Sequence, residues 1–563
     1  MKNKLFFVFL SLAALTSFPL SAGAATSDEF LSAMSLHLGS FAIQGADLDK
    51  QEIPITNEKL CLAAIYAATG MKPLWVTEKG PGEKAAIIRQ FLENAETEGL
   101  RPSDYDVAGI RFLWQSDKPA HLAQLDTQLT INLIKYTHDV SHGRILPFKT
   151  DPELFAEAGD KHFKPVLEVE QALAAQGLAG YLASLPPSHE HYRRLREALQ
   201  FYRKIAKSGG WEKVTNGKLL HPGDRDERIR QVRHRLAQAG MLAPVGENET
   251  LYDDELVPEV KKFQKKFSLE EDGIIGRETL SALNTSPEEI IDKIILNMSR
   301  WRWQEKELGR RRYIIVNIAN YDLRALEDGR EVLTMEVIVG KLQHQTPVFS
   351  GQVQYVDFNP FWNIPPSIAE KEELPELRND PFYLANRKVR LFSNWQEGGI
   401  ELDSTKIDWS LVTEDEMKRY KLRQDPGPWN ALGPVKLVFP NEYSVYIHGT
   451  PAQELFEHNK RNFSHGCIRV NQPLELARFT LSEEKQDWSM KKIEEIVAKG
   501  ERKVVSISSP LPIHITYQTA WVDNVGTIHF SGDVYGRDAI LAKILFASPG
   551  KTAGRSNNIP VNN

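Results

Sequence analysis

The sequence predicts a multidomain α+β protein in which helical domains precede a β-rich domain. The chain has 563 residues, too many for a single hydrophobic core. Apolar residues recur every three or four positions over much of residues 25–215, as in amphipathic helices. From residue 312 short β-branched runs favour strands. We therefore expect a helical domain over 25–215, a small three-helix domain over 216–285, a linker helix over 286–311 and a β-rich domain over 312–545.

The two ends of the chain differ in composition from the rest. Lys2 and Lys4 precede an apolar run, and Ala22-Gly23-Ala24 fits a small-residue cleavage site. Residues 1–24 are therefore predicted to be a signal peptide that directs export, the alternative being an uncleaved N-terminal anchor. Residues 546–563 are expected to form a disordered tail, because they are rich in Gly, Ser, Asn and Pro.

The overall composition is that of an ordinary globular protein. Hydrophobic residues make up 41% of the chain and charged residues 26%. The formal net charge of −6 gives no support for nucleic acid as a partner. The histidines include no His-Glu-x-x-His sequence and do not cluster at metal-ligand spacing away from the site described below. The sequence therefore predicts neither a metal nor another cofactor.

A long helix is predicted within the first domain. Its buried face is defined by apolar residues at helical spacing, which are Leu125, Leu129, Leu133, Tyr136 and Val140. Ser141-His142-Gly143-Arg144 follows, and Gly143 is typical of a helix C-cap.

Residues 216–285 contain three short segments in which apolar residues recur at helical spacing, and turns separate these segments. The first helix is expected to open at His221-Pro222-Gly223-Asp224 and to stop at Gly240. The three sets of apolar positions are Ile229, Val232 and Leu236; Val260, Phe263 and Phe267; and Thr279, Leu280 and Leu283.

The β-rich domain is expected to begin with strands over 313–318 and 332–339, joined by a hairpin turn at Glu327-Asp328-Gly329. Strands resume at Val435 and continue to His448. Asn471 and Pro473 are predicted to cap and open a later helix. The remaining expected elements are helices over 473–481 and 490–499 and strands over 504–507, 513–519 and 527–530.

Between these strands the β-pattern lapses over residues 366–428. The stretch is long and polar, with helix-like pieces, and includes a glutamate-rich segment at 370–376. An insertion of this length just before a strand that carries site residues favours a lid or a binding element. The glutamates are expected to form a solvated helix face.

The stretch 446–470 carries residues suited to nucleophilic catalysis. His448 stands at the end of a predicted half-buried strand, and Cys467 follows Gly466 in a tight turn. A thiol titrates near pH ~8.5, so a neighbouring imidazole must either lower its pKa or take its proton. His448 and His465 are the two candidates. The backbone N–H groups near Gly466 and Cys467 are expected to hold an oxyanion.

The chain has two cysteines, Cys61 and Cys467, and in an oxidising compartment they could form a disulfide. Cys61 lies on a helical stripe with Ala64, Ile65 and Ala68, which is typical of a small core residue. We therefore expect no bridge between the two cysteines, and Cys467 as the reactive thiol.

His448-Gly449-Thr450 followed by Ser464-His465-Gly466-Cys467-Ile468-Arg469 resembles the active-site signature of the YkuD-type L,D-transpeptidases. These cysteine enzymes cross-link peptidoglycan stem peptides. Asn430-Ala431-Leu432-Gly433 and Phe439-Pro440-Asn441 are similar to the multidomain YcbB-like branch of the family, and residues 66–75 resemble its scaffold region. Residues 216–285 are similar to a peptidoglycan-binding domain; whether they bind or only pack domains together stays open.

The resemblance implies a periplasmic enzyme with a β-rich catalytic domain and a capping subdomain at 366–428. Its partners would be tetrapeptide donor and acceptor stems of peptidoglycan, and carbapenem β-lactams would acylate it. Cys467 would be the nucleophile and His448 the base.

The remaining site assignments are less specific. Arg469 is expected either to hold a substrate carboxylate or to form a structural ion pair. Ser464, Tyr446 and Gly449 are assigned to the substrate-binding side. A cell-wall cysteine carboxypeptidase or endopeptidase, with water as the acceptor, would use the same residues. A non-catalytic wall-binding protein would not account for a cysteine placed between two histidines.

Overall fold

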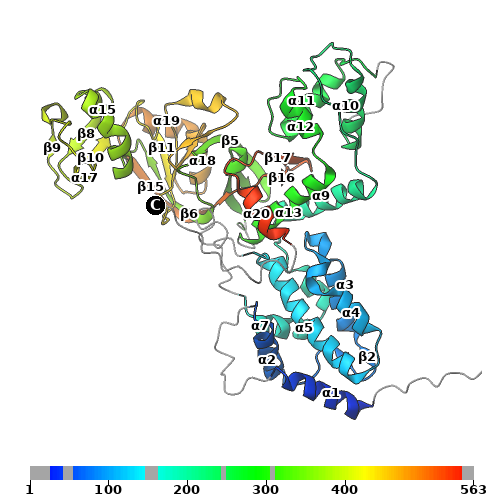
Figure 1. The fold of residues 1–563 in the computed structure, drawn as a ribbon. Coiled ribbons are helices and arrows are strands. Elements are labelled where there is room, and N and C mark those ends of the chain that lie inside the picture. Colours follow the sequence, from blue (N-terminus) through cyan, green and yellow to red (C-terminus); the bar gives the residue numbers. More distant parts are fainter. Residues whose placement is uncertain are drawn as a thin grey trace, which may run out of the picture. The chain divides into compact units, whose positions relative to one another are not determined.

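The computed structural model describes residues 26–41, 55–145, 163–241, 249–304, 308 and 311–547 (Figure 1). The expected signal peptide and residues 548–563 of the expected tail lie outside this range. The described residues form two compact units. One holds the described residues up to Glu93 together with 102–135 and 164–179, and the other holds 94–101, 136–145, 163 and the described residues from 180 onward. None of the described helices is long and apolar enough to cross a membrane.

The first unit is helical, as predicted. Its helices are α1 (Ser27–Gly39), α2 (Glu58–Ala68), α3 (Glu83–Glu93), α4 (Val107–Trp114), the first part of α5 (Pro119–Ser141) and α7 (Pro165–Ala174), with a short hairpin of β1 (Val76–Thr77) and β2 (Gly80–Pro81). Cys61 is fully buried on α2, and the predicted apolar face of α5 is buried.

A buried carboxylate organises this unit. Asp126 on α5 accepts backbone N–H groups from Leu74, Trp75 and Val76 at 2.7–3.1 Å and the Tyr66 hydroxyl at 2.5 Å. Four donors on one carboxylate compensate its removal from water. The stretch 66–75 therefore has a structural role, since the Tyr66 side chain at one end and the backbone at the other bind the same carboxylate of α5.

The three-helix domain consists of α10 (Glu227–Gln238), α11 (Leu256–Lys266) and α12 (Arg277–Leu283) around an apolar core. The predicted start of α10 was too early. Asp226 caps that helix by accepting the Arg228 N–H, while His221 to Asp224 form a turn closed by the Asp224 carboxylate. The expected linker, α13 (Pro287–Arg302), is largely buried and packs on α9 (Glu190–Lys207) and α20 (Arg537–Leu545). The short helix α8 spans Leu178–Ala183.

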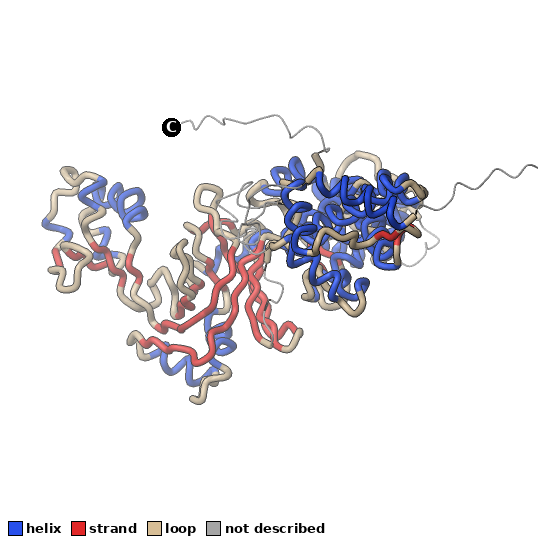
Figure 2. The backbone as a smooth tube through the Cα atoms, turned by 90° about the horizontal axis from the view of Figure 1, so that it is seen from below, coloured by secondary structure: helices blue, strands red, loops and turns tan. Residues whose placement is uncertain are grey.

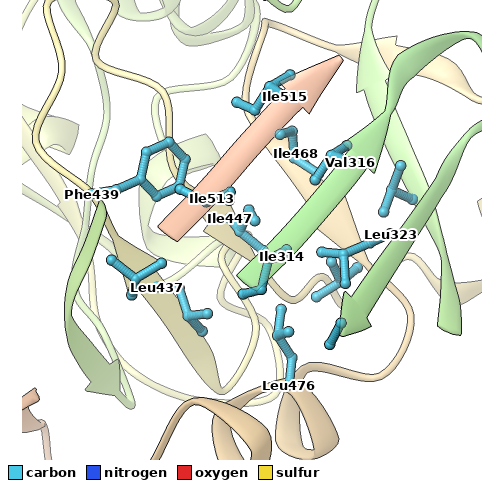
Figure 3. Packing of buried hydrophobic residues seen from close by; sticks show 14 of the residues in the cluster. Ile314, Val316, Leu323, Leu437, Phe439, Ile447, Ile468, Leu476, Ile513 and Ile515 are labelled. Atoms are coloured by element: carbon cyan, nitrogen blue, oxygen red, sulfur yellow. The ribbon is translucent and has the colours of Figure 1, made fainter. Parts of the chain in front are cut away.

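The β-rich domain contains a nine-stranded sheet in the order β13-β5-β14-β12-β11-β6-β15-β3-β4. Because β5 also pairs with β4, the sheet closes on itself. Its strands are β3 (Arg312–Asn317), β4 (Asp322–Glu327), β5 (Arg330–Gly340), β6 (Phe349–Phe358), β11 (Val435–Val438), β12 (Ile447–His448), β13 (Asn462–Ser464), β14 (Ile468–Val470) and β15 (Lys503–Thr516). Figure 3 shows the interior, where Ile314, Ile447 and Ile468 pack together.

Several predicted elements of this domain need correction. The turn at Asp328-Gly329 joins β4 to β5, and β4 was not predicted as a strand. The two strands predicted over 504–507 and 513–519 are one long strand, β15, with an irregularity between Ser506 and Leu511. The helices α18 (Pro473–Leu481) and α19 (Met490–Ala498) were predicted, but Gln472, not Asn471, is the N-cap of α18. A small hairpin, β16 (Ala520–Val522) and β17 (Ile528–Phe530), precedes α20.

The insertion 366–428 forms its own small subdomain, set apart from the large sheet in Figure 2. With residues 362–363 it contributes a four-stranded sheet in the order β7-β10-β8-β9, so the expected lapse in β-structure was wrong. The strands are β7 (Trp362–Asn363), β8 (Val389–Phe392), β9 (Glu401–Leu402) and β10 (Lys421–Gln424). The helices are α14 (Pro366–Ile368), a π-helical turn at Ala369–Glu373, α15 (Leu374–Asn379), α16 (Tyr383–Asn386) and α17 (Glu414–Met417).

The glutamates of this subdomain do not form one solvated face. Glu373 is buried and pairs with Arg387 at 2.6 Å, and Glu370 pairs with Lys418 at 2.9 Å. Glu372 and Glu376 are exposed. The prediction was wrong for the first two because their partners come from residues 14 and 48 positions further along the chain, beyond the reach of helical periodicity.

Two histidines at the start of α9 give the fold a dependence on pH. Burial lowers the pKa of His189 to about 3 and the pKa of His191 well below its usual range. Their buried Nε2 atoms form no hydrogen bond within the described residues, and the His191 ring stacks on Trp301 with centroids 5.1 Å apart. The unfolded chain would bind protons at these histidines near pH 6.5, whereas the folded chain would not.

The free energy of unfolding is therefore expected to fall as the pH drops from about 6.5 towards 3. His191→Phe keeps the ring stack and removes one titrating group. The difference in free energy of unfolding between this variant and the parent should therefore be about 1 kcal/mol or more larger at pH 5 than at pH 8, in favour of the variant. Denaturant unfolding at several pH values measures this difference. His234→Gln, at an exposed position on α10, is the matched control and should run parallel to the parent. Parallel curves for His191→Phe would contradict the prediction.

Candidate active site

The predicted site lies where β12 is held between β11 and β14. β12 pairs in parallel with β14, which places Ile447 beside Ile468 and His448 beside Arg469. It pairs antiparallel with β11, which places His448 beside Lys436. Side chains alternate along a strand, and Ile447 and Ile468 point into the core (Figure 3). His448 and Arg469 therefore project from the opposite face.

The Cys467 thiol stands beside this face, next to Tyr446. Its Sγ lies 3.9 Å from the Ser444 carbonyl oxygen. Burial raises the pKa of the Cys467 thiol, while hydrogen bonds from the Tyr446 backbone and hydroxyl and the charges of Lys436 and Arg469 act to lower it. Because burial is the largest effect, the resting group is the thiol, and a base must remove its proton before attack.

His448 is suited to be that base. Its Nδ1 lies 2.6 Å from the Gly449 carbonyl oxygen, and since a carbonyl only accepts, the proton is on Nδ1 and Nε2 keeps its lone pair. Burial lowers the pKa of His448 to about 3, helped by the positive charge of Arg469. The imidazole is therefore neutral near pH 7. No hydrogen bond joins His448 to Cys467 in the described part of the chain, so the catalytic pairing stays a prediction.

The turn before Cys467 is fixed by Ser464. Its hydroxyl donates to the Cys467 carbonyl at 2.5 Å and accepts the Gly466 N–H at 3.1 Å. Gly466 has φ 110°, which only glycine adopts without strain. The expectation that the Gly466 N–H is available to an oxyanion is thus corrected, because Ser464 already occupies it. The Cys467 N–H, by contrast, donates no hydrogen bond to any described residue.

A second layer of hydrogen bonds holds this turn in place. The buried Thr346 hydroxyl donates to the Gly466 carbonyl at 2.9 Å and accepts the Gly340 N–H at 2.9 Å. The Tyr535 hydroxyl accepts the Thr346 N–H at 3.2 Å and donates to the Gly340 carbonyl at 2.7 Å. Sequence reasoning missed Thr346 and Tyr535 as supports of the site. Tyr535 lies 68 residues beyond Cys467, and no local pattern marks it.

His465 faces away from the thiol. Its Nε2 lies 2.5 Å from Glu372 of the inserted subdomain and 3.1 Å from the Lys341 ammonium, and its ring lies 5.2 Å from that of His344. Of the two candidate bases, His448 is therefore the one that shares the catalytic face, while His465 connects the signature to the insertion.

The three residues assigned to substrate binding have different surroundings. Tyr446 lies under the Lys436 ammonium, which is 3.8 Å from its ring centroid. Gly449 accepts from His448, and a Cβ there would lie 3.1 Å from atoms of Pro434 and Pro473. Ser464 is buried and shapes the turn. Only Tyr446 contacts the thiol directly.

Arg469 is the remaining charged group of the site. It forms no ion pair with any carboxylate among the described residues, and its Nε is buried without a hydrogen-bond partner. Of the two expectations for Arg469, a structural ion pair is thus not observed. Burial lowers the pKa of Arg469, while the nearby Cys467 and Glu372 raise it. An enclosed guanidinium with spare donors next to a nucleophile is suited to a carboxylate ligand.

Two further observations bear on the chemistry. Cys467 is a free thiol, so the disulfide to Cys61 is not formed, as predicted. Within the described ranges, no group of three or more His, Cys, Asp or Glu side chains is arranged to hold a metal ion.

Comparison with protein families gives three matches along the chain. Residues 61–199 match the family described as "Scaffold domain", and residues 225–283 match the "Putative peptidoglycan binding domain". Residues 311–505 match YkuD, the "L,D-transpeptidase catalytic domain". A curated Haemophilus influenzae protein named "Putative L,D-transpeptidase" is 33% identical over 225 residues, which cover 40% of this chain and 44% of that protein. The match therefore spans less than half of the relative's length.

Two solved structures are also similar. An L,D-transpeptidase from Stackebrandtia nassauensis is 13% identical, with 54% of this chain and 95% of that chain covered at a TM-score of 0.20. One from Xylanimonas cellulosilytica is 13% identical, with coverages of 54% and 98% and a TM-score of 0.17. TM-scores this low support no structural argument. Along the chain, residues 311–505 are thus similar to the YkuD L,D-transpeptidase catalytic domain, and matches to a scaffold domain and a putative peptidoglycan binding domain precede them.

Proposed function

We propose that this protein is a peptidoglycan L,D-transpeptidase that joins stem peptides through a thioester on Cys467. The observation that carries the proposal is the composition of one sheet face. A thiol, a neutral imidazole and a guanidinium that lacks a carboxylate partner stand together on β12, β14 and the turn before it. The match of residues 311–505 to the YkuD L,D-transpeptidase catalytic domain supports this chemistry.

The first half-reaction acylates Cys467. His448 Nε2 takes the thiol proton as Sγ attacks the carbonyl carbon of the third residue of a donor tetrapeptide. The Cys467 N–H, which has no protein partner among the described residues, donates to the oxyanion that forms. The C–N bond then breaks, and His448 returns the proton to the departing D-amino acid.

The second half-reaction transfers the acyl group. An acceptor amine attacks the thioester carbonyl, loses its proton to His448, and the Sγ–C bond breaks to regenerate the thiol. With water as the acceptor, the same steps give an L,D-carboxypeptidase or endopeptidase, which is the second candidate.

The subdomain 366–428 is proposed to act as a lid over this site. Its Glu372 reaches His465 at 2.5 Å and Lys341 at 3.8 Å, so one carboxylate connects the insertion to both sides of the catalytic turn. Glu372 stands on a π-helical turn, a feature often found at functional sites. Its side chain is half exposed, so the contact is worth about 1 kcal/mol or less, which suits a lid that must open.

We further propose that the protein is exported to the periplasm, where peptidoglycan is reachable, on the basis of the leader-like residues 1–24. Carbapenem β-lactams are proposed as covalent inhibitors. The Cys467 thiol would attack their strained carbonyl, and Arg469 would pair with their carboxylate.

Replacement of Cys467 by Ala is expected to abolish acyl-enzyme formation, because no other group on the sheet face can form the thioester. His448→Gln should slow acylation at least ~10²-fold through loss of the base. Intact-protein mass spectrometry after incubation with a carbapenem measures both. Cys61→Ala, in the helical first unit, is the control and should be acylated like the parent. A mass gain on folded Cys467→Ala protein would reject the proposal.

Replacement of Arg469 by Gln is expected to raise the KM for the donor peptide about tenfold or more, with kcat changed less, because a charged hydrogen bond to the substrate is lost. Thermal stability should be unchanged or higher, since an unpaired enclosed cation is removed. Arg461→Gln is the contrasting control: Arg461 pairs with Glu336 at 3.2 Å and donates to the Tyr321 and Val337 carbonyls, so its loss should lower stability. A destabilised Arg469→Gln protein with normal KM would show a structural role instead.

Replacement of Glu372 by Gln is expected to loosen the lid. Backbone amides of residues 366–379 should exchange with solvent about two- to fivefold faster by mass spectrometry, in line with a surface ion pair. Turnover of a wall peptide should fall more than alkylation of Cys467 by a small thiol reagent. Glu376 is an exposed neighbour on α15, and Glu376→Gln should change neither the amide exchange nor the turnover. Equal changes in both variants would contradict the lid contact.

A further inference from the structure

A cleft is present whose lining includes none of the residues of the candidate active site. It has a volume of about 750 Å³ and is bounded by α9, residues 239–241 at the end of α10, α11 and the hairpin of β16 and β17. Phe201, Tyr202 and Ile528 supply apolar lining, and Lys262, Lys265 and Lys266 supply positive charge. Clefts of this volume accommodate small ligands and short peptides. Four different parts of the chain thus contribute to one hollow.

The walls of the cleft are held together by packing beneath it. Phe267, just beyond α11, contacts Phe530 of β17 with ring centroids 5.0 Å apart. The Ser268 hydroxyl contacts Ser531 and Asn320. Because these contacts fix α11 against the hairpin, the lysines of α11 face a defined surface rather than open solvent.

The floor of the cleft carries a cation with no counter-ion. Lys266 is only 7% exposed, and its ammonium donates to the Tyr202 hydroxyl at 3.1 Å. It forms no ion pair with any described carboxylate. Arg235, equally buried and without a carboxylate, stacks over Trp211 and adds a second positive charge near Lys266. Burial lowers the pKa of Lys266 to about 8, so the group is still mainly charged at neutral pH.

The acids of the cleft do not compensate this charge. Glu197 pairs with Arg193, Glu259 pairs with Lys262 at 2.7 Å, and Asp523 pairs with His529 at 2.8 Å. Burying a cation without a carboxylate costs folding free energy. Such a residue is expected where a ligand supplies the missing negative charge.

We propose that this cleft is a second, non-catalytic binding site for an anionic peptide, and that its ligand is a stem peptide of peptidoglycan. The identity of the ligand rests on the function proposed above. A carboxylate of the peptide would pair with Lys266, Lys265 would contact a second one at the rim, and aliphatic side chains would lie on Phe201 and Ile528. The site would hold wall material while another stem reacts at Cys467.

The test is photo-crosslinking of full-length Cys467→Ala protein with a stem tetrapeptide that carries a diazirine, followed by peptide mapping. Labels are expected on two groups of peptides, from the catalytic strands and from α9, α11 and β17. Lys266→Met and Lys265→Glu should each reduce the cleft labels about tenfold. Lys261→Glu, an exposed lysine of α11 that does not line the cleft, is the matched control and should leave them unchanged.

Each outcome separates the two proposals. Labels only on the catalytic strands would overturn the cleft site and leave the proposed function standing. Labels only in the cleft would overturn the proposed function and leave the cleft site standing. Absence of labels from both regions would overturn both proposals. Lys266→Met should also match or exceed the parent in thermal stability. A strongly destabilised Lys266→Met protein with unchanged cleft labelling would show that Lys266 only supports the fold.

Discussion

The parallel pairing of β12 with β14 is the contact on which the site depends. Ile447 and Ile468 lie side by side in it and are fully buried, so the register is set by the core. A slip of one residue on either strand would turn His448 or Arg469 inward and expose an isoleucine. The core that stabilises the domain therefore also decides that His448 and Arg469 share the outer face, beside the turn that carries Cys467.

That face has an excess of positive charge. Lys436 and Arg469 stand near the thiol, and burial lowers the pKa of both. Asp357 acts to raise the pKa of Lys436, and Glu372 acts to raise that of Arg469. Neither carboxylate forms an ion pair with its cation among the described residues, so a thiolate or a substrate carboxylate would be favoured beside them. The cleft around Lys266, which lies outside the candidate active site, has a similar arrangement of charges. In both places a cation is retained although the fold gives it no carboxylate.

The sequence allowed some of this to be predicted, namely wherever the determining contacts are local. Helical periodicity found the buried face of α5 and the apolar positions of α10 to α12, and the signature placed His448, Gly466 and Cys467. The failures share a cause. The pairing of Glu373 with Arg387, the small sheet of the insertion, and the support of Thr346 by Tyr535 all join residues far apart in the chain. The Gly466 amide was misjudged because glycine indicates a turn but not which acceptor occupies its N–H.

The protonation states of the site constrain the order of events in the proposed reaction. Burial favours the neutral form of both Cys467 and His448, so a resting thiolate–imidazolium pair would be doubly penalised. A carboxylate bound at Arg469 would cancel part of the positive field that favours the thiolate, and would disfavour that pair further. Proton transfer to His448 is then most favourable as the sulfur attacks, when the charge moves to an oxyanion that the Cys467 N–H can stabilise. A site built this way would keep its thiol unreactive until a carbonyl is in place.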